Sequence, residues 1–335
     1  MTPNDLQGYL GKLIANKLML SVMIWGPPGV GKSSVVAEAA KAHELGFIDL
    51  RLSQLAPTDL RGLPVPKDGV SRWYPPEFLP REGRGILFLD ELNMAPPALQ
   101  GIAQQLILDR RVGSYVLPDG YFVWAAGNRK EDRGSVFDMP SPLANRFLHL
   151  EVLPDFDAFK TYAIERELHE QVLAFLSYRP ALLHKIDVQR PAWPSPRSWE
   201  MASKLHGLKL RVGAAVGEGC EAEFEAFLSI YAKLGGIDDI LKGKGRKIAF
   251  PEEPSERYAI AVALSVRVKT SDQALASFRW LKERAAPEWV QLWATNMMVQ
   301  LRARGQITVF AAAVAADADL QAFLRDYQHL LTGGK

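Results

Sequence analysis

A glycine-rich stretch that ends in a lysine and a serine is the part of this sequence best suited to chemistry. Gly26, Gly31, Lys32 and Ser33 complete the pattern G-x-x-x-x-G-K-[ST]. Glycine lets successive backbone N–H groups turn inward around phosphate oxygens. Lys32 would then reach the β- and γ-phosphates of a nucleotide, and the Ser33 hydroxyl would ligate Mg²⁺. The residues predicted to bind the nucleotide are Gly26, Pro27, Pro28, Gly29, Val30, Gly31, Lys32, Ser33 and Ser34.

Two adjacent acids form the second candidate chemical group. Asp90 and Glu91 follow an apolar run at residues 86–89, which predicts a strand that delivers both acids to the carboxyl edge of a sheet. Asp90 would hold Mg²⁺, directly or through water, and Glu91 would take a proton from the water that attacks the γ-phosphate. Adjacent acids after a strand also cap helices, but the phosphate loop upstream favours the catalytic interpretation.

Three features of the sequence favour ATP over GTP as the nucleotide. An extra predicted strand at residues 46–52 lies between the phosphate loop and the acids. The acids read Asp-Glu rather than D-x-x-G, and the motif N-K-x-D does not occur. The sequence therefore does not fit a GTPase of the switch type.

The residues around these groups predict the elements that must position them. An apolar run at 20–25 predicts a strand before the glycines, and residues 34–41 predict a helix after them. These flanks disfavour the alternative interpretation, a chance glycine-rich turn. Further strands are predicted at residues 46–52, 85–90, 121–126 and 147–152. Five apolar strands that alternate with helices predict an α/β three-layer sandwich with a parallel five-stranded sheet.

Two β-hairpin insertions are predicted within this α/β region. The first lies at about residues 59–80, with a turn at Lys67-Asp68-Gly69, and the second lies at 111–122, with a turn at Pro118-Asp119-Gly120. From residue 155 onward the pattern is helical. We therefore predict an α/β nucleotide-binding core at 1–154, a helical lid at 155–250 and a C-terminal helical extension at 251–335.

The composition is that of an ordinary globular protein. Hydrophobic residues make up 48% of the 335 residues, and the formal net charge of +2 gives no strong field for nucleic acid. Cys220 is the single cysteine, which suits a reducing compartment. The first residues lack the pattern of a secretion signal, and the longest apolar run, Ile307–Ala316, is too short to span a bilayer. We expect a cytoplasmic protein without membrane insertion.

Taken together, the motifs resemble an AAA+ ATPase, and within that superfamily the MoxR group. The resemblance covers about residues 20–206 in the expected order. The stretches that carry it are GPPGVGKSS (26–34), LFLDELNMAPP (87–97), WAAGN (124–128), PLANRF (142–147) and PSPRSW (194–199). The first two stretches are specific to phosphate-loop ATPases, and the last three are informative through their order and spacing.

The resemblance implies roles for three further residues beside Glu91. Asn128 resembles the sensor-1 residue that positions the attacking water. Arg146 resembles the arginine finger that enters the active site of a neighbouring subunit, and Arg197 resembles the sensor-2 arginine of a lid helix. Read without the resemblance, the two arginines would be surface residues in ion pairs and Asn128 a turn residue. Arg129 and Arg133 lie close by and could share or take the finger role.

The chain departs from the family pattern in two places. Met94 stands where related proteins often have an arginine after the acids, so any coupling through that arginine is absent or moved. Residues 255–335 exceed a minimal lid and match no motif.

The resemblance also implies a function. MoxR-like proteins are ring-forming, Mg²⁺-dependent ATPases with chaperone-like activity, which remodel a protein client together with a partner that carries a von Willebrand factor A domain. A finger supplied by a neighbour implies a homo-oligomer, and we expect a hexamer. Trp73 and Tyr74, in the first insertion, could grip the client or simply pack their own hairpin.

Two other classes of function remain open. One is a nucleic-acid-associated motor or loader, which the near-neutral charge disfavours and which stimulation of ATP hydrolysis by DNA would distinguish. The other is a scaffold that binds ATP without turning it over, which the intact Glu91, Asn128 and Arg146 disfavour. The basic residues of the 242–247 stretch are interpreted as a solvated loop.

Overall fold

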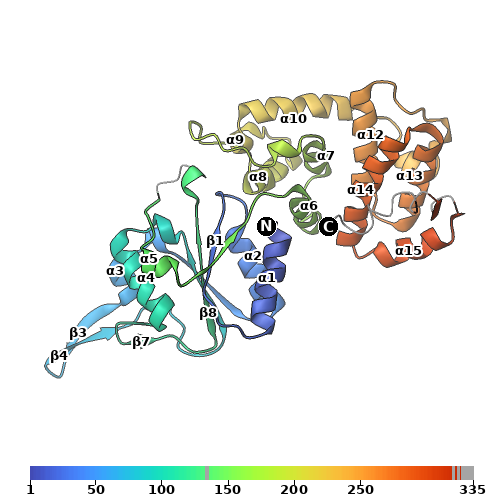
Figure 1. Ribbon diagram of the computed structural model, residues 1–335. Helices are drawn as coiled ribbons and strands as arrows, with labels where there is room; N and C mark the ends of the chain where they lie inside the picture. Colours follow the sequence, from blue (N-terminus) through green and yellow to red (C-terminus); the bar gives the residue numbers. More distant parts are fainter. Residues whose placement is uncertain (133–135, 319–320, 323–324, 326–335) are drawn as a thin grey trace. The chain divides into compact units, whose positions relative to one another are not determined.

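A computed structural model describes residues 1–132, 136–318, 321–322 and 325 of the chain (Figure 1). The chain divides into two compact units, Met1–Asp155 and Phe156–Lys335. The first unit is built around a β-sheet, and the second is helical.

The first unit contains a five-stranded parallel sheet in the order β2-β5-β8-β1-β9. The five strands are β1 (Val22–Trp25), β2 (Gly46–Arg51), β5 (Gly85–Asp90), β8 (Tyr121–Gly127) and β9 (Leu148–Glu151). Because all five strands run the same way, their carboxyl ends lie along one edge of the sheet. The predicted α/β fold with a parallel five-stranded sheet is confirmed.

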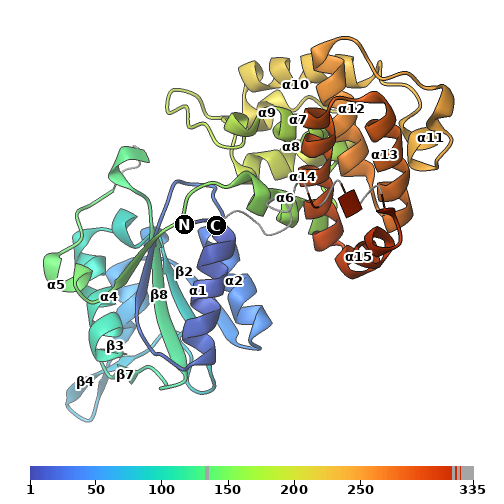
Figure 2. The same ribbon diagram turned by 45° about the vertical axis from the view of Figure 1, so that its right-hand side comes forward.

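Helices cover both faces of this sheet (Figures 1 and 2). One face carries α1 (Pro3–Ala15) and α2 (Lys32–Ala42), and the other carries α3 (Pro57–Arg61) and α4 (Pro97–Asp109). Successive strand residues enter opposite cores, since side chains alternate along a strand. A strand buried on both faces reads as a continuous apolar run, which explains the sequence pattern at 86–89.

The first predicted insertion is a two-stranded hairpin. Strands β3 (Leu63–Lys67) and β4 (Val70–Tyr74) are antiparallel, with Lys67 paired to Val70. Asp68 and Gly69 between them have φ angles of +55° and +77°. Two positive φ angles define the turn type whose twist matches antiparallel strands, so the turn that we predict at this position is confirmed.

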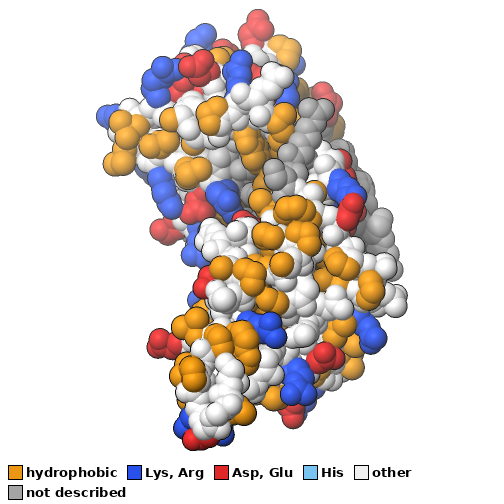
Figure 3. Space-filling view, turned by 90° about the vertical axis from the view of Figure 1, so that its left-hand side faces the viewer, with side chains coloured by type: hydrophobic (Ala, Val, Ile, Leu, Met, Phe, Trp, Pro, Cys, Tyr) orange, Lys and Arg blue, Asp and Glu red, His pale blue; other side chains and the backbone are white. Residues whose placement is uncertain are grey.

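The two aromatic residues of this hairpin differ in environment. Trp73 packs within the insertions: its ring lies 4.5 Å from the Arg61 guanidinium carbon, and its carbonyl accepts a 2.7 Å bond from Ser114 Oγ. Tyr74 is exposed, and Figure 3 shows several hydrophobic side chains at the surface on this side of the unit. The exposed apolar residues of the hairpin are Leu63, Val65, Val70 and Tyr74.

The second insertion differs from the prediction. Strands β6 (Arg111–Val112) and β7 (Tyr115–Val116) pair around Gly113, whose φ is +57°, rather than around the Pro-Asp-Gly stretch at 118–120. The 118–120 stretch does form a turn, but it leads into β8 of the central sheet. The residues from 121 onward are buried between β5 and β1, so they are not available to pair with the hairpin.

Short elements complete the first unit. The 3₁₀ helices are η1 (Leu52–Gln54), η2 (Leu92–Met94) and η3 (Lys130–Asp132), and α5 spans Ser141–Ala144. The three 3₁₀ helices follow the carboxyl ends of β2, β5 and β8, so they border the edge where the loop and the acids lie, whereas α5 precedes the amino end of β9.

The second unit is a helical domain with one core. One hydrophobic cluster extends from Phe159 to Phe310, so the helices on both sides of the predicted boundary at residue 250 share it. Residues 319–320, 323–324 and 326–335 of the predicted extension lie outside the described residues. The helices are α6 (Phe156–Glu165), α7 (Glu170–Tyr178), α8 (Pro196–Gly207), α9 (Gly213–Val216), α10 (Glu218–Tyr231), α11 (Ile237–Leu241), α12 (Pro254–Arg267), α13 (Ser271–Arg284), α14 (Pro287–Ala303) and α15 (Ile307–Ala315), with the 3₁₀ helices η4 (Pro180–Leu182) and η5 (Gly245–Lys247).

The start of α8 follows from its sequence. The Ser195 hydroxyl accepts a 3.1 Å bond from the Ser198 amide, and Pro196 occupies the first helical position. A serine cap and a first-turn proline are favourable because neither leaves a backbone donor unpaired. Arg197 is therefore in the first turn of α8, as the sequence predicts, and its side chain is exposed.

Within the described part of the chain, every helix is too short or too polar to cross a lipid bilayer.

One charged side chain lies inside the core of the second unit. Lys160 of α6 is completely buried, and its Nζ donates to Asn296 Oδ1 of α14. Burial lowers the pKa of Lys160 to about 7, although the neighbouring Asp157 carboxylate opposes this shift. The unfolded chain therefore binds one more proton than the folded chain between about pH 7 and the ordinary lysine pKa.

We expect this lysine to make the second unit more stable at alkaline pH. The free energy of unfolding should rise by about 2 kcal/mol between pH 7 and pH 9, because deprotonation removes a charge that only the unfolded state solvates. Urea denaturation of the full chain at pH values from 7 to 9 measures this free energy of unfolding. Lys160→Met should lose this rise, whereas Lys233→Met, at an exposed position, should keep it. An unchanged pH profile in Lys160→Met would contradict the assignment.

Candidate functional site

The glycine-rich loop joins β1 to α2 as its motif requires. Gly29 and Gly31 have φ angles of +79° and +96°, a conformation that favours glycine. Gly26 is buried, and a Cβ atom at this position would lie 2.5 Å from the Val152 carbonyl oxygen. The helix begins directly at Lys32, so its first-turn amides, which have no acceptor within the helix, lie at the end of the loop. This geometry suits an anion.

Lys32 connects the loop to the neighbouring strand. Its Nζ donates to the carbonyl oxygens of Gly26 and Pro27, at 2.7 and 3.2 Å, and to Asn128 Oδ1 at 3.0 Å. Asn128 directly follows β8, which pairs with β1. Two residues that the sequence singles out separately are thus in contact. All three acceptors are uncharged, so a charged phosphate oxygen would bind the ammonium group more strongly.

The acidic pair lies at the carboxyl end of β5, as predicted. Asp90 Oδ1 accepts a 2.9 Å bond from the Glu91 amide, and Glu91 has a φ of +57°. Burial raises the pKa of Asp90, as does the Glu91 charge to a smaller extent, whereas the Glu91 amide bond and the charges of Lys32 and Arg51 oppose the shift. Burial is thus the main cause of the raised pKa, and the two nearby cations offset it only in part.

The residues predicted to hold Mg²⁺ fit that ion by their chemistry. Ser33 offers a hydroxyl in the first turn of α2, and Asp90 offers a largely buried carboxylate. Oxygen ligands of this kind are the ones that Mg²⁺ takes in proteins. A divalent cation at this position would favour the ionised form of Asp90 and so oppose the effect of burial on its pKa.

Ser53 contacts Glu91, a contact that the sequence does not reveal. Ser53 belongs to η1, directly after β2, and its Oγ donates to Glu91 Oε2. The register pairs Arg51 with Asp90, so the segments that follow these two strands must meet. A serine directly after the strand predicted at 46–52 is the only signal that the sequence carries for this contact.

Asn93 fixes the backbone at Asn128. Its buried side-chain amide donates to the Asn128 carbonyl at 2.8 Å and accepts from the Asn128 N–H at 3.1 Å. At Gly127 a Cβ atom would collide with the Asn93 side chain, so glycine is required there. The Asn128 side chain also donates to Met94 Sδ at 3.2 Å. Met94, which departs from the family pattern, thus contacts the predicted sensor.

The predicted arginine finger and its nearby alternatives differ in their surroundings. Arg146 follows α5, and its exposed side chain has no ion-pair or hydrogen-bond partner in the part of the chain that the structure describes. Arg129, by contrast, is held by Asp132, with bonds of 2.8 and 3.0 Å, and by Glu151 at 2.8 Å. These hydrogen bonds, the one to Asp132 above all, raise the pKa of Arg129, although partial burial opposes them. Arg133 lies outside the described residues.

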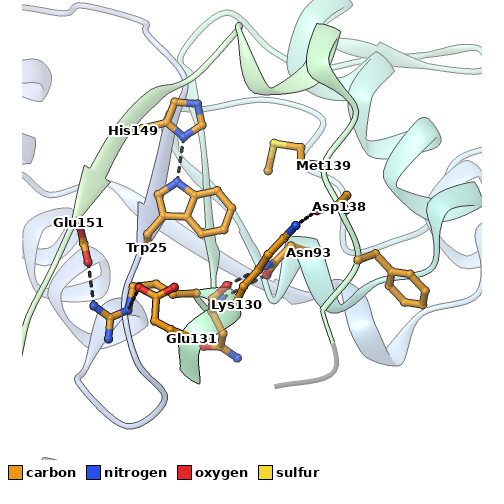
Figure 4. Close-up of a pocket in the computed structure, with 11 residues that line it drawn as sticks. Trp25, Asn93, Lys130, Glu131, Asp138, Met139, His149 and Glu151 are labelled. Atoms are coloured by element: carbon orange, nitrogen blue, oxygen red, sulfur yellow. Dashed lines mark hydrogen bonds and ion pairs between the residues drawn. The ribbon is translucent and has the colours of Figure 1, made fainter. Parts of the chain in front are cut away.

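A pocket of about 520 Å³ opens beside Asn128 (Figure 4). Trp25 of β1 and His149 of β9 form one wall, and a hydrogen bond joins their rings. The other lining residues come from the segments after β5 and β8 and from β9: they are Asn93, Asn128, Arg129, Lys130, Glu131, Phe137, Asp138, Met139 and Glu151.

The structure thus brings together Lys32 and Asn128 by direct contact, with Glu91 at the end of the strand beside β8. Arg146 lies on the same unit, next to β9. Arg197 belongs to the second unit, so its predicted role as sensor 2 stays a prediction.

Residues 21–147 match the family model described as AAA domain (dynein-related subfamily). A segment of 143 residues, 39% of this chain, is 29% identical to Midasin from Giardia intestinalis, and it spans only 3% of that relative's length.

Among solved structures, the chain is similar to a RuvB mutant from Thermotoga maritima, with 18% identity, a TM-score of 0.38 and coverage of 84% of this chain and 83% of that one. It is also similar to NtrX from Brucella abortus in complex with ADP, with 16% identity, a TM-score of 0.36 and coverage of 96% and 68%. The segment that matches the AAA domain contains Glu91, Asn128 and Arg146, so all predicted catalytic residues except Arg197 lie within it.

Proposed function

We propose that this protein is an Mg²⁺-dependent ATPase whose triphosphate binds in the loop from Gly26 to Ser34. The observation that carries the proposal is the contact between Lys32 Nζ and Asn128 Oδ1. It places the only side-chain cation of the loop at the carboxyl end of β8, beside the strand that ends in the two acids. A phosphate-binding lysine, a polar residue and a carboxylate pair at one sheet edge are the parts that hydrolysis of a γ-phosphate needs.

Each group would have a distinct role in hydrolysis. Lys32 exchanges its carbonyl partners for the β- and γ-phosphate oxygens, and Asn128 orients the attacking water. Glu91 accepts a proton from that water. Because the Ser53 hydroxyl occupies one oxygen of the Glu91 carboxylate, this contact must loosen, or the second oxygen must act as the base. Mg²⁺, held by Ser33 and Asp90, would neutralise charge on the phosphates.

Arg146 would complete the site of a neighbouring subunit. Its exposure and its lack of a partner among the described residues leave the guanidinium available to a second chain, whereas Arg129 is occupied by its own acids. An arginine supplied in trans stabilises the charge that develops on the γ-phosphate. Arg197 would act as a second sensor from the helical unit, at the start of α8.

By resemblance to the MoxR group, we further propose a cytoplasmic ring motor, a hexamer, with chaperone-like activity. It would remodel a protein client together with a partner that carries a von Willebrand factor A domain. The exposed apolar residues of the β3–β4 hairpin, Tyr74 among them, support contact with a polypeptide client, whereas Trp73 is engaged within the insertions.

Removing the loop lysine should abolish nucleotide binding. Lys32→Ala loses the charged contact to the phosphates, so the dissociation constant for ATP should rise by about 100-fold or more. Calorimetry with ATP and Mg²⁺ measures this. Lys41→Ala, an exposed lysine at the other end of α2, is the matched control and should bind normally. Retained affinity in Lys32→Ala would exclude this loop as the site.

Removing the amide that holds Asn128 should slow hydrolysis without weakening binding. Asn93→Ala removes the partner of the half-buried N–H and carbonyl of Asn128, so Asn128 should shift and kcat should fall by about 10- to 100-fold. A steady-state ATPase assay and a titration with ATP separate the two effects. Asn16→Ala, at the exposed end of α1, is the control. Normal turnover in Asn93→Ala would show that hydrolysis does not depend on this clamp.

Arg146 should act on a neighbour rather than on its own subunit. Arg146→Ala alone should lose about 1,000-fold in kcat while still binding ATP. Mixing it with Glu91→Gln subunits, which retain the arginine but lack the base, should restore part of the activity. Arg81→Ala, another exposed arginine, should remain active. If mixing restores nothing while both variants assemble, the role in trans is wrong.

A further inference from the structure

His149 forms two hydrogen bonds that link the phosphate loop's strand to the turn that carries Arg146. Trp25 Nε1 donates to His149 Nδ1 at 2.8 Å, and His149 Nε2 lies 2.8 Å from the Ala144 carbonyl oxygen (Figure 4 shows the first of these bonds). The planes of the two rings are nearly parallel, at an angle of 11°, and their centroids lie 6.0 Å apart, as an in-plane hydrogen bond requires.

These partners determine which ring nitrogen of His149 carries the proton. The indole N–H of Trp25 can only donate, so Nδ1 of His149 must accept. A carbonyl oxygen can only accept, so Nε2 must carry the proton and donate it to Ala144. Both polar atoms of the ring are therefore used, and a flipped ring or the other tautomer would lose both bonds.

The carbonyl that His149 contacts closes the turn of the predicted finger. Ala144 is the last residue of α5, and its carbonyl oxygen also accepts the Phe147 N–H at 3.2 Å. Arg146 lies inside this turn, and its own N–H donates to the Leu143 carbonyl at 3.1 Å. A helix of only four residues is not stable by itself, so its last turn depends on contacts from outside, of which His149 supplies one.

The other end of the link is the phosphate loop. Trp25 is the last residue of β1, and the carbonyl oxygen of Gly26, which follows it, accepts a hydrogen bond from Lys32 Nζ. The Trp25 carbonyl is itself held by the Val152 N–H at 2.8 Å. Through His149, the indole of Trp25 thus connects the start of the phosphate loop to the turn that carries Arg146 of the same chain.

We propose that His149 is a positioning residue for Arg146, and that Trp25 holds it in the donating tautomer. This inference rests on the proposed role of Arg146 in a neighbouring subunit. Loss of His149 should therefore impair hydrolysis at the neighbour's site while leaving nucleotide binding in its own subunit intact.

Two amide substitutions separate the bonds of His149. The Nε2 of a glutamine can reach the place of the histidine Nε2 and donate to Ala144, whereas an asparagine is too short for that bond and can only accept from Trp25. His149→Gln should keep kcat within about twofold of the native value, and His149→Asn should lower it by about 10- to 100-fold at unchanged ATP affinity. Equal activity of the two variants, high or low, would overturn the proposal.

A mixing experiment tests whether the effect acts in trans. His149→Asn subunits still hold their own base, so Glu91→Gln subunits with an intact finger should restore part of their activity. Absence of restoration would overturn the positioning role if Arg146→Ala is restored by the same partner. If neither variant is restored, the proposed role of Arg146 itself fails.

A second variant guards against a folding defect in His149→Asn. Trp25→Phe keeps a ring against His149 but removes the N–H that selects its tautomer, so kcat should fall severalfold with ATP binding retained. His43→Asn, a half-buried histidine at the end of α2, is the control and should behave as the native protein does. Native kcat in Trp25→Phe would overturn the role given to Trp25.

Discussion

The ammonium group of Lys32, held by two loop carbonyls and by Asn128, is the interaction on which the rest of the site depends. It requires the glycine loop to curl back on itself and requires β8 to end beside β1. The parallel sheet provides this second condition, because it aligns the carboxyl ends of its strands along one edge. The site therefore depends on the register between β1 and β8. A shift of one residue along β8 would move Asn128 out of reach of Lys32.

Burial and hydrogen bonds constrain the other predicted site residues near Lys32. Burial is the first cause of the raised pKa of Asp90, and a magnesium ion bound to this carboxylate would lower that pKa. Ser53 restrains Glu91, and Asn93 restrains Asn128, so both groups that would handle the attacking water are held by neighbours. The backbone at Asn128 is thus fixed before the substrate binds, whereas Lys32 must exchange its loop carbonyls for phosphate oxygens.

Much of this could be predicted from the sequence, for local reasons. Short sequence motifs identify the loop, the acids and the first hairpin. The glycines of the loop and the Asp68-Gly69 turn adopt positive φ angles, which few residue types favour. The predicted position of the second hairpin's turn is wrong because two turn signals compete, one at Gly113 and one at residues 118–120. The residues after 120 are buried in the central sheet as β8, so the hairpin turns at Gly113. Contacts such as Ser53 with Glu91, or Arg129 with Glu151, join residues that are far apart in the sequence and depend on the register of the sheet. Such contacts are tertiary, so no local pattern reports them.

The most direct test of this account is an experimental structure of the full chain with a non-hydrolysable ATP analogue and Mg²⁺. We predict that Lys32 Nζ leaves the Gly26 and Pro27 carbonyls and contacts the β- and γ-phosphates, with Asn128 beside the γ-phosphate. Nucleotide bound elsewhere on the chain, or bound here with Lys32 still on the loop carbonyls, would contradict the account.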